Sequence, residues 1–172
     1  QVSLSVVVQQ MVLPDVSGIM FTADPITGDR FITSIDASYG LGEALVAGLV
    51  SADLYKVNRH TYTLTDIQIA DKQIAIRPLP DGGTVEETIT GAARTAQVLS
   101  EAQAIILAEI GDRIARHYDQ PQDIEWALTN GKFTILQSRP ITSLFPIPER
   151  ALDTAKETGE LQVMFSFASV QG

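Results

Sequence analysis

The stretch Gln122-Asp-Ile-Glu-Trp-Ala-Leu-Thr-Asn-Gly-Lys-Phe-Thr-Ile-Leu-Gln-Ser-Arg-Pro140 carries the most informative pattern in the sequence. Apolar and polar residues alternate on both sides of Asn130-Gly131, which is typical of two β-strands joined by a tight turn. Successive side chains of a strand point to opposite faces, so the apolar face that includes Trp126 lies opposite the face that carries Glu125. We therefore predict a β-hairpin with one apolar face and one polar face.

The length of the turn decides whether Glu125 and Gln137 share a face. A two-residue turn, Asn130-Gly131, places Glu125 opposite Leu136 and on the other face from Gln137. A three-residue turn, Thr129-Asn-Gly131, makes Glu125 and Gln137 diagonal neighbours with Cα atoms about 7–8 Å apart. An Asn-Gly pair is the usual signature of the shorter turn, but the longer turn ends on a glycine, as here. We predict the three-residue turn.

With that turn, Glu125, Gln137 and Arg139 line one surface of the hairpin. Carboxylate and amide oxygens are hard donors, which suit a Mg²⁺ ion held jointly by the protein and by nucleotide phosphates. A guanidinium group is a forked, permanently charged donor that suits phosphate oxygens. The alternative, judged from spacing alone, is a surface hairpin whose polar residues bind nothing.

The rest of the chain predicts an α+β domain built on a largely antiparallel sheet. Hydrophobic patterning predicts further strands over 2–12, 16–22 and 31–37, and several between 53 and 78 with tight turns at 58–60 and 71–72. A short helix is expected over 43–50. The clearest helix runs from Ser100 to about His117, opens with a capping box, and has an apolar face formed by Ala102, Ile105, Ile106, Ile110, Ile114 and His117. We assign 1–145 to this domain, incomplete at its N-terminus, 146–162 to a linker, and 163–172 to a following domain.

Composition excludes several classes of function. The sequence has no cysteine, so disulfides, thiolate zinc sites and cysteine nucleophiles are impossible. The net charge of −9 argues against a nucleic-acid partner, which requires clustered lysine and arginine. No stretch approaches the roughly 20 apolar residues of a membrane span, and the N-terminus does not resemble a signal peptide. We expect a cytoplasmic protein with no membrane partner.

Five motifs, in order, resemble the ATP-grasp domain of the phosphoenolpyruvate synthase and pyruvate phosphate dikinase family. They are Val7-Val-Gln-Gln-Met-Val12, Ser17-Gly-Ile-Met-Phe-Thr22, Tyr39-Gly-Leu-Gly-Glu43, Gln122-Asp-Ile-Glu-Trp126 and Leu136-Gln-Ser-Arg-Pro-Ile-Thr142. The likeness covers about Val6 to Ile147 and implies the second lobe of an ATP-grasp fold. Within the family, the segments 35–46, 49–53 and 144–149 are similar to the rifamycin phosphotransferase branch, and synthase-like members share much of them.

The resemblance also implies roles for individual residues. Glu125 and Gln137 would coordinate the metal, and Arg139 would be the catalytic residue that contacts the β- and γ-phosphates of ATP. The backbone of a strand-to-linker segment would read the adenine edge; its residues here are Gln9, Gln10, Met11 and Val12. The alternatives are that the two glutamines interrupt an edge strand and that Met11 and Val12 are core. Glu43 would contact the nucleotide after the Gly40-Leu-Gly42 turn, or would instead act as a helix cap.

The implied partners lie in the same polypeptide. A preceding ATP-grasp lobe would complete the ATP site with a further lysine and arginine. A separate domain would carry a phosphohistidine that passes the β-phosphoryl group to pyruvate or to a rifamycin. Neither His60 nor His117 lies in a motif that resembles this carrier. Two alternatives remain open: a different ATP-grasp ligase, which would form an acyl phosphate, and a nucleotide-binding module without catalysis.

Overall fold

The computed structural model describes residues 6–79 and 81–144. The chain divides into two compact units, Gln1–Thr142 and Ser143–Gly172, and the elements described below belong to the first. The linker predicted at 146–162 and the strand of a following domain predicted at 163–172 lie outside the described residues.

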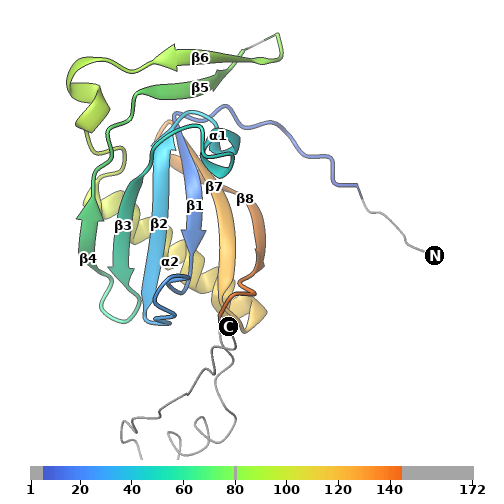
Figure 1. The fold of residues 1–172 in the computed structure, drawn as a ribbon. Helices are drawn as coiled ribbons and strands as arrows, with labels where there is room; N and C mark the ends of the chain where they lie inside the picture. The colour runs from blue at the N-terminus through green and yellow to red at the C-terminus, as the bar shows by residue number, and fades with distance from the viewer. Residues whose placement is uncertain (1–5, 80, 145–172) are drawn as a thin grey trace, which may run out of the picture. The chain divides into compact units, whose positions relative to one another are not determined.

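A six-stranded antiparallel sheet forms the body of this unit, with strand order β4-β3-β2-β1-β7-β8 (Figure 1). Its strands are β1 (Val16–Phe21), β2 (Ile32–Tyr39), β3 (Asp53–Asn58), β4 (Thr63–Gln68), β7 (Gln122–Thr129) and β8 (Lys132–Pro140). Strands β1 to β4 pair antiparallel in sequence order, β7 pairs with β8, and β1 also pairs with β7 from the far end of the chain. The predicted α+β class with a largely antiparallel sheet is confirmed.

The long helix α2 (Glu101–Tyr118) covers one face of the sheet (Figure 1). Its predicted capping box is present: the Ser100 hydroxyl accepts the Gln103 N–H at 3.2 Å, and Gln103 Oε1 accepts the Ser100 N–H at 2.9 Å. These bonds satisfy two N–H groups that the first helical turn leaves free. The core lies between α2 and the sheet, where Trp126, Tyr55 and Met20 are fully buried.

The buried face of α2 differs from the predicted one. The residues in contact with the sheet are mostly small: Ala104, Leu107, Ala108, Gly111, Asp112 and Ala115. The predicted isoleucines lie at the margins, Ile106 being 49% exposed, and His117 is exposed. Close approach explains the difference, because a Cβ at Gly111 would lie only 2.6 Å from the Met20 side chain. Large side chains at these positions would hold the helix away from the sheet.

The strand predicted over 2–12 is wrong in its described part. Residues 6–12 are extended but belong to no strand, and Val6, Val7 and Val8 are 82–92% exposed. The segment leads away from the sheet (Figure 1). A strand requires a partner for its backbone groups, and none of the described strands pairs with this segment. The apolar side chains of residues 6–12 are therefore not buried in this structure.

A second sheet of two strands, β5 (Ile74–Pro78) and β6 (Thr84–Thr88), lies at one end of the larger sheet (Figure 1). The turn predicted at 58–60 does join β3 to β4, but 71–72 does not form a hairpin. Lys72 is instead fully buried, with Nζ 2.5 Å from Asp53 Oδ1, and the chain leaves the main sheet there. Strand β6 and the short 3-10 helix η1 (Gly91–Thr95) were not predicted.

The helix α1 (Gly42–Val46) is shorter than the expected 43–50. It packs against β1 and β7 at the same end of the sheet as β5. No helix in the described part of the chain is both long and apolar enough to cross a membrane.

Candidate functional site

The turn of the β7–β8 hairpin has two residues, so the predicted three-residue turn is wrong. Thr129 pairs with Lys132, and Leu128 pairs with Phe133. Asn130 and Gly131 have φ angles of 51° and 76°, which are the positive values that this turn requires at both central positions. Glycine at the end of the turn suits both turn lengths, and asparagine tolerates the left-handed conformation that decides between them.

A β-bulge nevertheless brings Glu125 and Gln137 onto one face. Trp126 pairs with Ile135, but the next pair is Glu125 with Gln137, so Leu136 is an extra residue on β8. One extra residue shifts the register by one position and reverses which side chains face which way. The predicted shared face is thus confirmed, and the two residues are direct rather than diagonal neighbours. The bulge, and not the length of the turn, therefore places Glu125 and Gln137 on the same face.

The face of the sheet opposite α2 is polar and half-buried. Cross-strand pairing places Asp36, Ile19, Glu125 and Gln137 in one row across four strands. Burial raises the pKa of Asp36 above its usual value. The adjacent row, from β3 to β8, contains Lys56, Ser34, Phe21, Asp123 and Arg139. Charged groups are therefore concentrated on this face, while the other face is mostly apolar.

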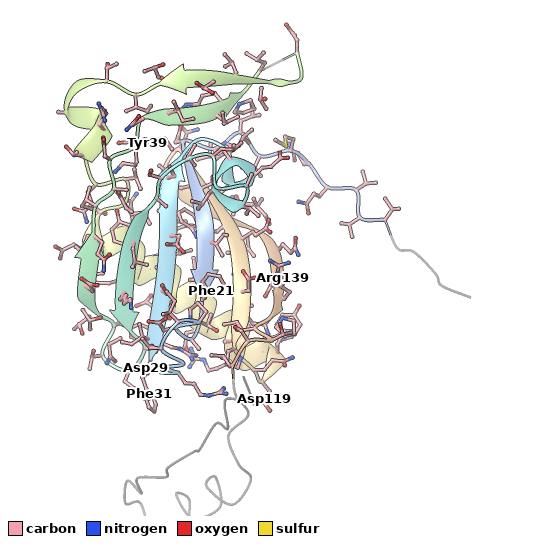
Figure 2. The ribbon with its side chains drawn as sticks, in the orientation of Figure 1. Phe21, Asp29, Phe31, Tyr39, Asp119 and Arg139 are labelled. Carbon is pink, nitrogen blue, oxygen red and sulfur yellow. The ribbon has the colours of Figure 1, made fainter. Side chains whose placement is uncertain are left out.

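Arg139 is held at this face by Asp123, a residue that the sequence prediction did not assign. Arg139 Nε donates to Asp123 Oδ2 at 2.9 Å, and this hydrogen bond raises the pKa of the guanidinium group. Arg139 remains 58% exposed, on the β8 edge (Figure 2). The other oxygen, Asp123 Oδ1, is buried and has no hydrogen-bond partner among the described residues. Alternation alone places Asp123 on the same face as Glu125. The bulge at Leu136 then pairs Asp123 with Arg139.

A pocket of about 280 Å³ lies between α1, β1, β7 and the segment before β1. It brings together six of the predicted residues: Gln9, Gln10, Met11, Val12, Glu43 and Glu125. Gln137 and Arg139 do not line it; they follow Glu125 and Asp123 across the hairpin. Met11 is 64% exposed, so it is not a core residue. The pocket is near the lower end of the size range of small-molecule sites.

Two glycines allow the chain segments around this pocket to approach each other. A Cβ at Gly18 would lie 1.8 Å from the Asp36 carbonyl oxygen. Gly40 has φ 77°, and a Cβ there would lie 2.2 Å from the Ile76 carbonyl oxygen. Only glycine fits at either position. The predicted glycine turn before α1 therefore has a structural cause, namely contact with β5.

The pocket and the hairpin beside it offer too few oxygen donors to hold a metal ion without ligands from a bound molecule. No group of three or more His, Asp or Glu side chains within the described ranges is arranged to bind a metal ion. A metal at Glu125 and Gln137 would need further ligands from a bound molecule. Both histidines lie away from the pocket lining: His60 stacks on Phe31 with ring centroids 4.9 Å apart, and His117 lies beside Tyr118.

Known proteins that resemble this chain point to a nucleotide site. Residues 1–160 match the family model described as pyruvate phosphate dikinase, AMP/ATP-binding domain. Rifampicin phosphotransferase from Bacillus subtilis (strain 168) is 55% identical over 149 residues, which are 87% of this chain and 17% of that protein. Phosphoenolpyruvate synthase from Pyrococcus furiosus is 41% identical over 172 residues, covering 95% of this chain and 21% of that protein.

This chain thus spans about a fifth of the length of the curated relatives that it matches. The match to the family model covers all the described residues, including both sides of the pocket and the whole hairpin. The family resemblance inferred from the five motifs is confirmed. The chain belongs to the pyruvate phosphate dikinase AMP/ATP-binding domain family.

Proposed function

We propose that this chain is the second lobe of the ATP site of a longer phosphotransferase, and that Mg-ATP binds against the sheet face opposite α2. The bulge carries the proposal, because it places Glu125 directly opposite Gln137 at the edge of the pocket. Without the bulge, the two-residue turn would separate the two oxygen donors. A bulge next to a pocket is a common device for re-aiming a side chain toward a ligand.

The adenine would lie in the pocket, against Gln9–Val12. This segment is extended and pairs with no described strand, so its backbone N–H and C=O groups are available to a ligand. Backbone groups in such a position can read the donor and acceptor pattern of a base edge. Glu43, which lines the same pocket from the start of α1, would contact the nucleotide as well.

The donor set fits a magnesium ion shared with phosphates. Glu125 and Gln137 offer one carboxylate and one amide oxygen, and the phosphates would supply further oxygen ligands. The unpartnered Asp123 Oδ1 beside them is a further polar atom suited to this environment. Bound magnesium would neutralise phosphate charge. Arg139, the proposed catalytic residue, would donate to phosphate oxygens from the orientation that Asp123 imposes.

The phosphoryl acceptor is proposed from the relatives. Those named above are a rifampicin phosphotransferase and a phosphoenolpyruvate synthase, so we propose transfer of the ATP β-phosphoryl group to a rifamycin or to pyruvate. A preceding ATP-grasp lobe and a phosphohistidine domain, in the same cytoplasmic polypeptide, would complete the reaction. Because the relatives are about five times longer than this chain, such domains have room in a protein of their size.

The test compares Glu125→Gln with Glu86→Gln in the complete polypeptide. The control makes the same chemical change on exposed β6, outside the pocket lining. We expect Glu125→Gln to lower phosphotransfer about 10²–10³-fold and to weaken the magnesium dependence of ATP binding, whereas Glu86→Gln matches wild type. Unchanged transfer and magnesium dependence in Glu125→Gln would refute the metal role. Binding without any transfer by the wild type would identify a non-catalytic module, and an acyl-phosphate product would identify a ligase.

A further inference from the structure

Arg77 lies on β5, outside the pocket lining, yet its hydrogen bonds reach a residue next to the pocket. Its Nη1 atom donates to the carbonyl oxygen of Asp15 at 3.1 Å, and its Nε atom donates to Glu87 Oε2 at 2.8 Å. Glu87 belongs to β6, so the guanidinium group connects the small sheet to the segment that precedes β1. Pro14, which immediately precedes Asp15, lines the pocket.

Asp15 connects several parts of the pocket at once. Its carbonyl oxygen also accepts the Gly40 N–H at 3.1 Å, so it has two donors. Its own N–H donates to the Leu128 carbonyl at 3.0 Å, and its Oδ2 atom accepts the Asn130 N–H at 2.9 Å. Asp15 therefore fixes the start of β1 relative to the β7–β8 turn and to the glycine turn before α1.

The residue before Arg77 holds the opposite wall of the pocket. The Ile76 carbonyl accepts the Leu41 N–H at 2.9 Å, and Ile76 also forms a parallel bridge with Gly40. Leu41 and the two residues that follow it line the pocket. Two consecutive residues of β5 thus hold two different walls: Ile76 holds the turn before α1, and Arg77 holds the segment before β1.

We propose that Arg77 is a positioning residue of the nucleotide pocket, which sets the distance between the Gln9–Pro14 segment and the glycine turn without touching the nucleotide. The inference rests on the proposed function. The hydrogen bond to Asp15 has a charged donor, which makes it stronger than a neutral one and directional. The ion pair with Glu87 is partly exposed and contributes little stability by itself. Arg77 therefore acts mainly on the position of the chain segments that form the pocket, and little on overall stability.

Four single variants of the complete polypeptide test this role. Arg77→Gln removes the charged donor, and Arg77→Lys keeps the charge but replaces the planar fork by a single ammonium group. Glu87→Gln removes only the ion pair. Arg94→Gln is the matched control, because Arg94 forms an exposed ion pair with Asp71 in the same region and its side chain makes no bond to Asp15.

We expect Arg77→Gln to raise the Kd and the KM for ATP about 3- to 10-fold, the effect of one ordinary hydrogen bond, because the bond to Asp15 is exposed to solvent. The kcat should stay within about twofold because phosphate contacts are unchanged. Arg77→Lys should recover part of the affinity. Glu87→Gln and Arg94→Gln should bind ATP as the wild type does, and all four should unfold at similar temperatures.

Wild-type ATP affinity in Arg77→Gln would overturn the inference. So would an equal loss of affinity in Arg94→Gln, since this would show a general effect of removing surface charge. If Arg77→Gln fails to fold, Arg77→Lys decides by the same criteria. Absence of ATP binding in the wild type would refute the proposed function and the inference together. If the wild type binds ATP and Arg77→Gln binds it equally well, only the inference is refuted.

Discussion

The two faces of the six-stranded sheet are built from the same strands but serve different purposes. On the α2 face, the side chains of Met20, Ile124 and Trp126 are fully buried and apolar. On the other face, one position along the same strands, Ile19, Glu125 and Asp123 are only half-buried, and charges predominate. Strand alternation thus separates the buried apolar side chains from the face that we propose for Mg-ATP, residue by residue. Substitutions on the first face should change stability, and those on the second should change activity.

The largest effect is expected in the core. Leu107→Ala should lower the free energy of unfolding by about 2–5 kcal/mol, because it leaves a cavity in place of a fully buried side chain. The control is the preceding residue: Ile106→Ala, at 49% exposure, should cost less than about 1 kcal/mol. Denaturant unfolding measures both. Equal losses would contradict the observed orientation of α2.

The next effect concerns Asp112, a charged residue on the buried face of α2. Asp112 accepts hydrogen bonds from Arg59 and from Tyr62, whose hydroxyl lies 3.0 Å from Oδ2. Burial alone would raise the pKa of Asp112, but the bonds from Arg59 and Tyr62 outweigh it and lower the pKa. A lowered pKa gives stability that is present above about pH 4 and lost as the pH falls through the folded-state value.

Asp112→Asn should therefore destabilise the protein by about 2 kcal/mol at pH 7, because charged donors lose their partner. Unfolding measured from pH 7 to pH 2 should converge for the two proteins at acid pH. A pH-independent difference would show that the carboxylate charge is not the cause.

On the open face, we expect an effect on activity with little effect on stability. Asp123→Asn weakens the hold on Arg139 and should lower phosphotransfer about 10-fold or more. The thermal unfolding midpoint should hardly change, because Arg139 is mostly exposed. The measurement pairs initial rates with calorimetry. A marked loss of stability with normal rates would reverse the functions that we assign to the two faces.

The smallest effect should come from Asp36. Burial raises its pKa, so its contribution to stability is full below the unfolded-state value near 4 and decreases as the pH rises through the folded-state value. Asp36→Asn should therefore stabilise the protein slightly at pH 7, by less than about 1 kcal/mol, and not at pH 3. Equal unfolding midpoints of the variant and the wild type at both pH 7 and pH 3 would contradict this prediction.

Local patterns in the sequence predicted much of the fold. Alternation identified both strands of the β7–β8 hairpin, and the Ser100–Gln103 capping box located the start of α2, because each depends on neighbouring residues. Features that depend on distant partners were predicted less well. The exposed run at 6–12 looks like a strand but has no described partner. The chain leaves the main sheet before β5, at the point where Lys72 is buried against Asp53.

For the candidate site, sequence reasoning placed Glu125 and Gln137 on one face but gave the wrong structural cause, and the binding roles of these residues stay predictions. Glu125 and Gln137 do share a face, although the cause is an extra residue at Leu136 rather than the turn. No local signal marks that bulge, because Leu136 fits a strand as well as its neighbours do. Alternation could have placed Asp123 on the face of Glu125, but its pairing with Arg139 depends on the bulge. Arg77 was not, because its relation to Asp15 exists only after β5 has crossed to the end of the sheet.

The pairing of β1 with β7 also has a consequence for the order of folding. Thr22 Oγ1 accepts the N–H of Gln122, 100 residues further along the chain, whereas β2, β3 and β4 pair in sequence order across shorter connections. Closing the longer loop costs more chain entropy, so contacts of this kind form slowly. The pocket lies across this junction of β1 and β7. We therefore expect the surface of the pocket to form late in refolding, after most of the chain has acquired its secondary structure.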